Sequence, residues 1–166
     1  ALLARGPAPQ LTRLACSLVS LSADFSALPG LQALYVDAIT QLDRPTSIAA
    51  ATSLTRLQLQ MCNADTEHVP ATLELLRSLP PSLSYLDMEG HCYEEVAAVI
   101  GELPGLVALK LYHFDTGDKF LPPAGASVWS RLRALSVESD AGVNLPKVQT
   151  LRQAQSKLCM YPCPLS

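Results

Sequence analysis

The sequence predicts an α/β solenoid, a curved horseshoe with a parallel sheet on its concave face and short helices and 3-10 turns on its convex face. Two observations carry this prediction. The phrase Leu-x-x-Leu-x-apolar occurs six times, and its first leucines are 20, 23, 29, 23 and 26 residues apart. A strand phrase recurring at such a period indicates stacked repeats, each burying its apolar edge against the next. The phrases begin at Leu11, Leu31, Leu54, Leu83, Leu106 and Leu132.

The second half of each phrase predicts a short strand. Side chains of a strand point alternately to its two faces. The fourth and sixth positions of the phrase are apolar, so we expect them to point into the solenoid. This inward row reads Leu14/Cys16, Leu34/Val36, Leu57/Leu59, Leu86/Met88, Leu109/Leu111 and Leu135/Val137. The third, fifth and seventh positions should then point outward on the concave face.

The longest return segment, residues 65–79, predicts a helix. Val69, Leu73 and Leu76 are spaced at i, i+4 and i+7, which places them on one apolar stripe. Pro80 follows and ends the helix.

Residues 94–103 predict a second helix, with acidic residues at its N-terminus that suit the helix dipole. Its apolar face comprises Val96, Val99, Ile100 and Leu103. The return segments near 24–29, 46–52 and 125–130 are shorter, so we expect single helical turns or 3-10 pieces there.

The six repeats occupy residues 11–140. Residues 1–10 are interpreted as the tail of a preceding repeat or a partial cap. The chain begins at Ala1 rather than Met, which indicates a processed product or a piece of a longer protein. Beyond Val137 the pattern fades, and residues 141–166 are interpreted as a degenerate repeat followed by a C-terminal tail.

The repeats resemble the leucine-rich-repeat family over residues 11 to about 140. The unit from Leu54 is similar to the ribonuclease-inhibitor-like or cysteine-containing classes, and the 23-residue units are similar to the SDS22-like class. The sequence departs from the family eight residues after the first leucine, where the family has Asn or Cys. That position holds Val19, Ile39, Cys62, His91, Phe114 and Asp140. Only Cys62 matches, so the other turns need different hydrogen-bond partners or water.

Composition limits the classes of function. The chain is 49% hydrophobic and 16% charged, which indicates a packed core rather than disorder. Its net charge is −3 without a basic run, so we expect no nucleic-acid partner. No apolar stretch reaches the roughly 18 residues needed to span a membrane. Five cysteines, an odd number, and the lack of an Asn-x-Ser/Thr sequon favour an intracellular, cytoplasmic protein.

The sequence predicts no enzyme and no cofactor, since it lacks phosphate-loop, zinc-hydrolase and serine-hydrolase motifs. Cys62 and His91 share one position in adjacent repeats. Three interpretations of these two residues are open: a thiol–imidazole pair, two metal ligands, or a stacked turn with satisfied side chains. Because further ligands are lacking, we predict no metal site there. Cys159 and Cys163 form a weak metal motif, a cap contact or a disulfide. Trp129 is expected to pack on the convex side, with a partner contact as the alternative.

The outward strand positions are the candidate partner-binding site. Tyrosines in these rows supply the large amphipathic contacts typical of interface anchors, and the acidic far edge favours a partner with basic residues. The alternative is a set of simply solvated strand residues. The candidates are Arg13, Tyr35, Asp37, Arg56, Gln58, Tyr85, Asp87, Glu89, Lys110, Tyr112 and Glu138.

The concave face is small for an interface. Six strands about 4.8 Å apart give a face of about 400 to 500 Å², whereas a standard interface uses about 800 Å² of each partner. Loops, helices or further repeats would therefore have to contribute to a stable complex.

Three functions follow as alternatives. The first is a non-enzymatic scaffold that binds a partner protein through the concave strand face. The second is a structural subunit of a large assembly, such as a ciliary or organellar complex, held by its convex face or edges. The third is the substrate-recognition part of an F-box ubiquitin ligase, whose repeats are similarly irregular.

Overall fold

The computed structural model describes residues 10–17, 20–21, 24–39, 41–42, 45–61, 69–90, 94–112, 126–138 and 159–160. Within these ranges the chain forms an open parallel sheet whose strands follow one another in sequence order. Its strands are β1 (Arg13–Ser17), β3 (Ala33–Ile39), β5 (Arg56–Met61), β6 (Tyr85–Glu89), β7 (Ala108–Tyr112), β8 (Ala134–Glu138) and β9 (Cys159–Met160). Because neighbouring strands are parallel, the chain returns to the same end of the sheet before each strand.

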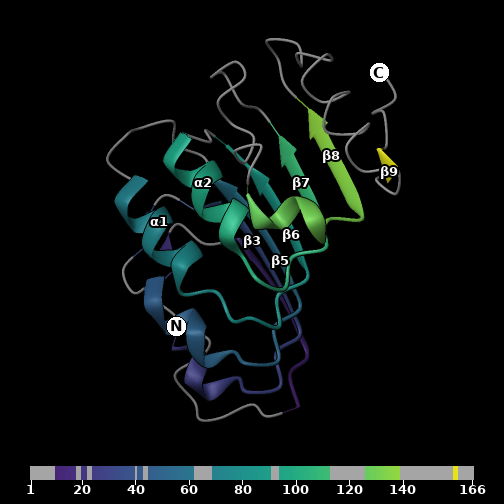
Figure 1. Cartoon of the computed structure of the whole chain (residues 1–166). Coiled ribbons are helices and arrows are strands. Elements are labelled where there is room, and N and C mark those ends of the chain that lie inside the picture. The colour runs from purple at the N-terminus through teal and green to yellow at the C-terminus, as the bar shows by residue number, and fades with distance from the viewer. Residues whose placement is uncertain are drawn as a thin grey trace, which may run out of the picture.

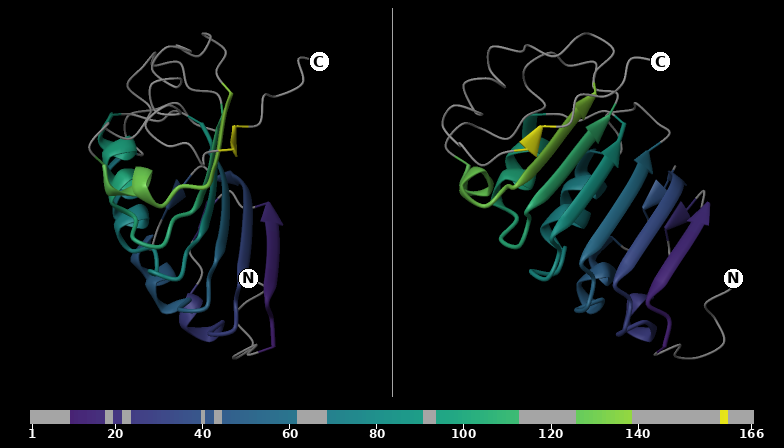
Figure 2. Two further views of the ribbon diagram at one scale, coloured as in Figure 1. Left: turned by 45° about the vertical axis from the view of Figure 1, so that its right-hand side comes forward. Right: turned by 90° about the vertical axis from the view of Figure 1, so that its right-hand side faces the viewer.

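The described return segments lie along one face of the sheet (Figures 1 and 2). They are η1 (Phe25–Ala27), η2 (Pro45–Ala50), α1 (Val69–Arg77), α2 (Glu94–Glu102) and η5 (Ser127–Ser130). On the opposite face, none of these helices covers β1 to β8; we call this the open face. The prediction of an α/β fold with a parallel sheet, short helices and 3-10 turns is confirmed.

The strands pair in the register that the repeated phrase predicts. Leu34 lies opposite Leu57, and Leu57 lies opposite Leu86. The alignment continues through β7 and β8. A register shift between Val36 and Ile39 interrupts the β3–β5 pairing near the end of β3.

The core lies between the sheet and the layer of helices. Most of the predicted inward row is buried: Leu34, Val36, Leu57, Leu59, Leu86, Met88, Leu109, Leu111 and Leu135. Leu14, Cys16 and Val137 are only partly buried, because β1 is an edge strand and β9 pairs with β8 only at Ala134 and Leu135. The parity of the phrase is thus confirmed. Burying each large apolar side chain contributes about 1.5–3 kcal/mol.

Helix α1 is rotated from the predicted stripe. Leu76 is fully buried as expected, but Val69 and Leu73 are only partly buried. Thr72 and Leu75 are buried instead. The cause is tertiary: α1 packs against η2 on one side and α2 on the other, so its covered arc extends beyond the face that meets the sheet.

Helix α2 buries the predicted residues. Val96, Val99, Ile100 and Leu103 are all buried, together with Ala97 and Gly101. Glu94 and Glu95 occupy the first turn, where a negative charge is favourable.

The C-terminal end of α2 is capped by the next unit of the chain. The Arg131 guanidinium donates to the Leu103 carbonyl at 2.8 Å, and the Ser127 hydroxyl donates to the Gly101 carbonyl at 3.3 Å. A cation at a helix C-terminus is also favoured by the helix dipole. These bonds tie η5 to α2.

The three short return segments form 3-10 helices, as predicted. Trp129 lies in η5 and is 5% exposed within the core. Its packing on the helix side of the sheet is therefore confirmed, and the partner-contact alternative has little exposed ring surface to act through.

Backbone bonds join the strands where they begin. The Gln32 carbonyl accepts the N–H groups of Thr55 and Arg56 at 2.9 and 3.0 Å, and the same two-donor arrangement recurs at each described step from Thr12 to Val107. The Thr55 hydroxyl adds a third bond to the Gln32 carbonyl at 3.1 Å. These hydrogen bonds satisfy backbone polar groups of the turns that precede the strands. At the family's Asn position, only Ile39 lies within the described residues.

Three short strands were not predicted. The two-residue strands β2 (Ser20–Leu21) and β4 (Gln41–Leu42) pair in parallel, and β9 pairs with β8. Elements this short carry no periodicity that a sequence pattern could reveal. The predicted tail or cap over 1–10, apart from its last residue, and the degenerate repeat over 141–166, apart from β9, lie outside the described residues.

Candidate functional site on the open face of the sheet

The strand register brings the predicted site residues together in rows across the open face. Arg56 lies opposite Tyr85 and Gln58 lies opposite Asp87, which lies opposite Lys110. Arg13 and Tyr35 belong to the same rows on β1 and β3. Glu89, Tyr112 and Glu138 form the last row, near the ends of their strands, although the Glu138 side chain lies outside the described part. Asp37 lies near the end of β3.

Two cation–π contacts cover the tyrosines on β6 and β7. The Arg56 guanidinium carbon lies 4.1 Å from the centre of the Tyr85 ring. The Lys110 ammonium lies 4.1 Å from the centre of the Tyr112 ring. Each contact contributes about 0.5–1 kcal/mol at an exposed site. These two rings therefore already contact cations of the chain itself.

Asp87 is the buried charge of this face. The residue is 5% exposed, and its carboxyl accepts a hydrogen bond from the Tyr85 hydroxyl at 3.2 Å. Burial raises the pKa of Asp87, because it penalises the carboxylate, while the nearby Lys110 ammonium opposes that rise. Burial and the Asp87 charge together raise the pKa of the Tyr85 phenol. Asp87 thus interacts with its neighbours within the open face, and little of its surface is exposed.

We name as the paired cluster five residues on β5, β6 and β7 that are linked by two cation–π contacts, one hydrogen bond and the attraction between the charges of Asp87 and Lys110. Its members are Arg56, Tyr85, Asp87, Lys110 and Tyr112. Alternating cations, rings and one carboxyl satisfy each other, so the paired cluster is a preorganised surface.

The face differs over β1, β3 and the middle of β5. Among the described residues, the side chains of Arg13, Tyr35, Asp37 and Gln58 form no hydrogen bond, ion pair or ring contact with one another or with the paired cluster. Arg13, Asp37 and Gln58 are exposed. We name these four residues the unpaired cluster. Within the described ranges, these are the predicted site residues whose side-chain bonding groups have no partner.

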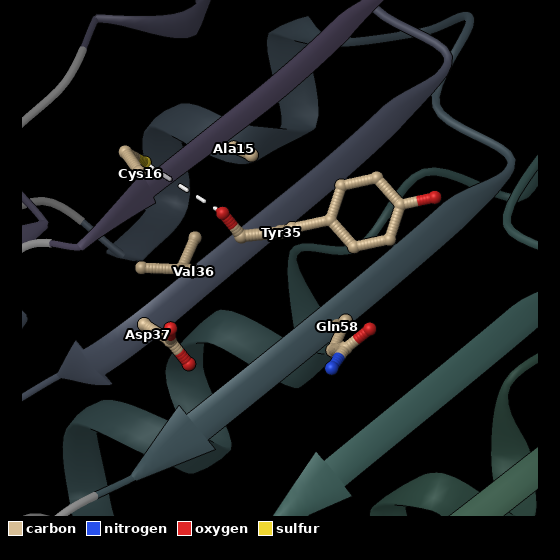
Figure 3. Close-up of a pocket in the computed structure, with 6 residues that line it drawn as sticks. All are labelled: Ala15, Cys16, Tyr35, Val36, Asp37 and Gln58. Atoms are coloured by element: carbon tan, nitrogen blue, oxygen red, sulfur yellow. Dashed lines mark hydrogen bonds between the residues drawn. The ribbon is translucent and has the colours of Figure 1, made fainter.

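A first hollow lies within the unpaired cluster. It has a volume of about 320 Å³ and is lined by Ala15, Cys16, Tyr35, Val36, Asp37 and Gln58. Figure 3 shows the Tyr35 ring projecting from β3 toward β5, with Asp37 farther along the same strand. The small side chain of Ala15 leaves room beside the ring.

A second hollow lies across the beginnings of the strands. It has a volume of about 370 Å³, and its lining includes Arg13, Ala33, Tyr35, Arg56 and Tyr85. Ala33 lies in register between Arg13 on β1 and Arg56 on β5. The register therefore places the small side chain of Ala33 between two cationic residues. The second of these, Arg56, also lies over the Tyr85 ring of β6. Tyr35 lines both hollows and connects them.

Cys16 is a free, partly buried thiol that donates to the Tyr35 carbonyl at 3.7 Å. Burial raises the pKa of Cys16, which disfavours the thiolate required of a nucleophile. The described residues contain no group of three side chains suited to a metal ion. The predicted pair Cys62 and His91 lies outside the described residues, as does Cys163.

Sequence reasoning placed the site residues on one face but did not distinguish the paired from the unpaired cluster. Part of the signal was present, since aligning the phrases puts Arg56 beside Tyr85. The burial of Asp87 and the two hollows leave no such signal in the sequence, because they depend on the conformations of neighbouring side chains.

No protein-family model, curated protein or solved structure matched this chain. Within the described ranges, no helix has the length and apolar character that crossing a bilayer requires.

Proposed function

We propose that this chain is a leucine-rich-repeat solenoid that works as a non-enzymatic scaffold and binds a partner protein on its open, concave face. The in-register stacking of the repeated phrase supports the solenoid. The observation that carries the binding function is the unpaired cluster. Its exposed polar groups surround Tyr35 and border two hollows on the face that the described helices leave uncovered.

The division of the face assigns different roles to its residues. Tyr35 supplies an aromatic side chain of the kind that dominates binding energy at interfaces. The paired cluster supplies a rigid neighbouring surface that needs little ordering on binding. Because the strand face is small, contacts beyond it must add to the interface.

Site-specific photo-crosslinking tests this proposal. A benzophenone side chain placed at Tyr35 should capture a partner, whereas the same group at the exposed Glu74 of α1 should not. Capture only from position 74 would contradict binding through the open face.

Binding of the captured partner should then depend on the unpaired cluster. Tyr35→Ala combined with Asp37→Lys should weaken it by about tenfold or more, as expected for removal of an interface anchor. Glu74→Lys is the matched control on the helix side and should leave the affinity unchanged. Equal affinity for both variants would refute the proposal.

A further inference from the structure

We propose that the segment bound at the unpaired cluster is bipolar: an acidic group between Arg13 and Arg56, an apolar side chain against Tyr35, and a basic group at Asp37. This inference rests on the proposed function and names the chemistry of its partner. It refines the expectation of a partner with basic residues, which the acidic far edge of the strand rows predicts.

Charge complementarity supports the acidic end. Arg13 has no bonding partner among the described residues, and the Arg56 guanidinium carbon lies 4.1 Å from the centre of the Tyr85 ring. A guanidinium has several N–H donors, so Arg56 can donate to a carboxylate while it keeps this contact. Ala33 provides the small floor between these two cations. A carboxylate over Ala33 would therefore face positive charge on both sides.

The basic end is set by Asp37. This carboxylate is exposed, lines the first hollow and forms no ion pair with a described residue. Asp37 lies four residues after Ala33 on β3, which is about 13 Å at about 3.3 Å per residue. An ammonium or guanidinium group bound there would lie about that far from the carboxylate.

The middle of the segment faces Tyr35, which connects the two hollows. In an extended peptide, residues i, i+2 and i+4 point to one side and span the same length as Ala33 to Asp37 on β3. An acidic, an apolar and a basic residue at these three positions therefore match the face in spacing and in charge. A segment with a basic residue at both ends would place one of them against Arg13. A segment with an acidic residue at both ends would place one of them against Asp37. Either arrangement brings like charges together.

Three synthetic peptides test this inference on the isotopically labelled 166-residue chain by NMR titration. They are Glu-Ser-Leu-Ser-Lys, Lys-Ser-Leu-Ser-Lys and Glu-Ser-Leu-Ser-Glu, each with blocked termini. The bipolar peptide should bind about twofold to fivefold more tightly than either of the others, since one exposed ion pair contributes up to about fivefold. The NMR chemical-shift changes should fall on residues of β1, β3 and β5.

Charge reversal gives the sharper comparison. Asp37→Lys should shift the preference to the peptide with two glutamates. Because Arg56 remains, Arg13→Glu should reduce, rather than reverse, the advantage of the bipolar peptide over the peptide with two lysines. Glu102→Lys, an exposed position at the end of α2, is the control and should leave the ranking unchanged.

Several outcomes would overturn the inference. They are equal binding of all three peptides, preference of the unaltered chain for a like-charged peptide, or no binding of the bipolar peptide at about 1 mM. If crosslinking at Tyr35 still captures a partner that requires this face, the proposed function stands while the bipolar chemistry fails.

Discussion

Gly105 gives the most direct test of how the turns stack. A Cβ atom at this position would lie 2.2 Å from the Pro81 carbonyl oxygen and 2.7 Å from that of Leu83. Favourable contacts between heavy atoms lie near 3.5 Å, so the two turns would have to separate by about 1 Å. Both obstructing atoms belong to the backbone and cannot rotate away. Gly105→Ala should therefore strain the packing of neighbouring units.

The expected cost follows from two opposing effects. Overpacking costs about 1–3 kcal/mol, and replacing glycine recovers about 0.4–1 kcal/mol by restricting the unfolded chain. We expect a net loss of about 1–2 kcal/mol, which lowers Tm by about 2–8 °C in a chain of this size.

Urea and thermal unfolding followed by circular dichroism measure this loss. Glu102→Ala is the matched control, because it adds no atom and lies exposed at the end of α2. It should change the free energy of unfolding by less than about 0.5 kcal/mol. If Gly105→Ala is as stable as this control, the close approach of the two turns is wrong.

Three further predictions concern other parts of the fold. Gly90 has φ 133°, so Gly90→Ala should lower the free energy of unfolding in urea by about 1–3 kcal/mol, and an unchanged value would contradict that backbone conformation. Leu57→Ala should cost about 2–5 kcal/mol because Leu57 is fully buried, whereas Gln58→Ala beside it should cost less than about 0.5 kcal/mol; similar losses would refute the assigned parity. Because burial raises the pKa of Asp87, the folded chain holds its proton to higher pH than the unfolded chain, and this stabilising effect is lost as pH rises through the raised pKa. Urea midpoints should therefore show the native chain losing stability relative to Asp87→Asn from about pH 4 upward, and the opposite trend would exclude desolvation as the dominant effect.

Much of the fold could be predicted because the leucine phrase encodes both strand position and parity. Leu34 and Leu57 are buried and Gln58 is exposed, as the alternation requires. The face of α1 was predicted less well, since packing against η2 and α2 decides which residues are covered. Strand β9 was missed because a pairing over two residues leaves no periodic trace.

For the candidate site, the sequence assigned residues to the open face but did not predict which of them would be buried or paired. Tyr35 and Tyr85 occupy outward positions of the same phrase and are equivalent in the pattern. In the structure Tyr85 lies under Arg56 and donates to Asp87, whereas Tyr35 borders two hollows. This difference depends on which residue type lies opposite in the neighbouring strand and on how far its side chain reaches.

The sequence by itself determined the order of the strands, their register and the division between core and surface, because these follow from a period of two within the strand and a repeated leucine phrase. Only the tertiary structure decided that Asp87 is buried, that Gly105 must lack a side chain, and that the side chains of Arg13, Tyr35 and Asp37 have no partner among the described residues. The physical reason is that burial, close approach and pairing are properties of neighbours in space, which one strand phrase does not specify.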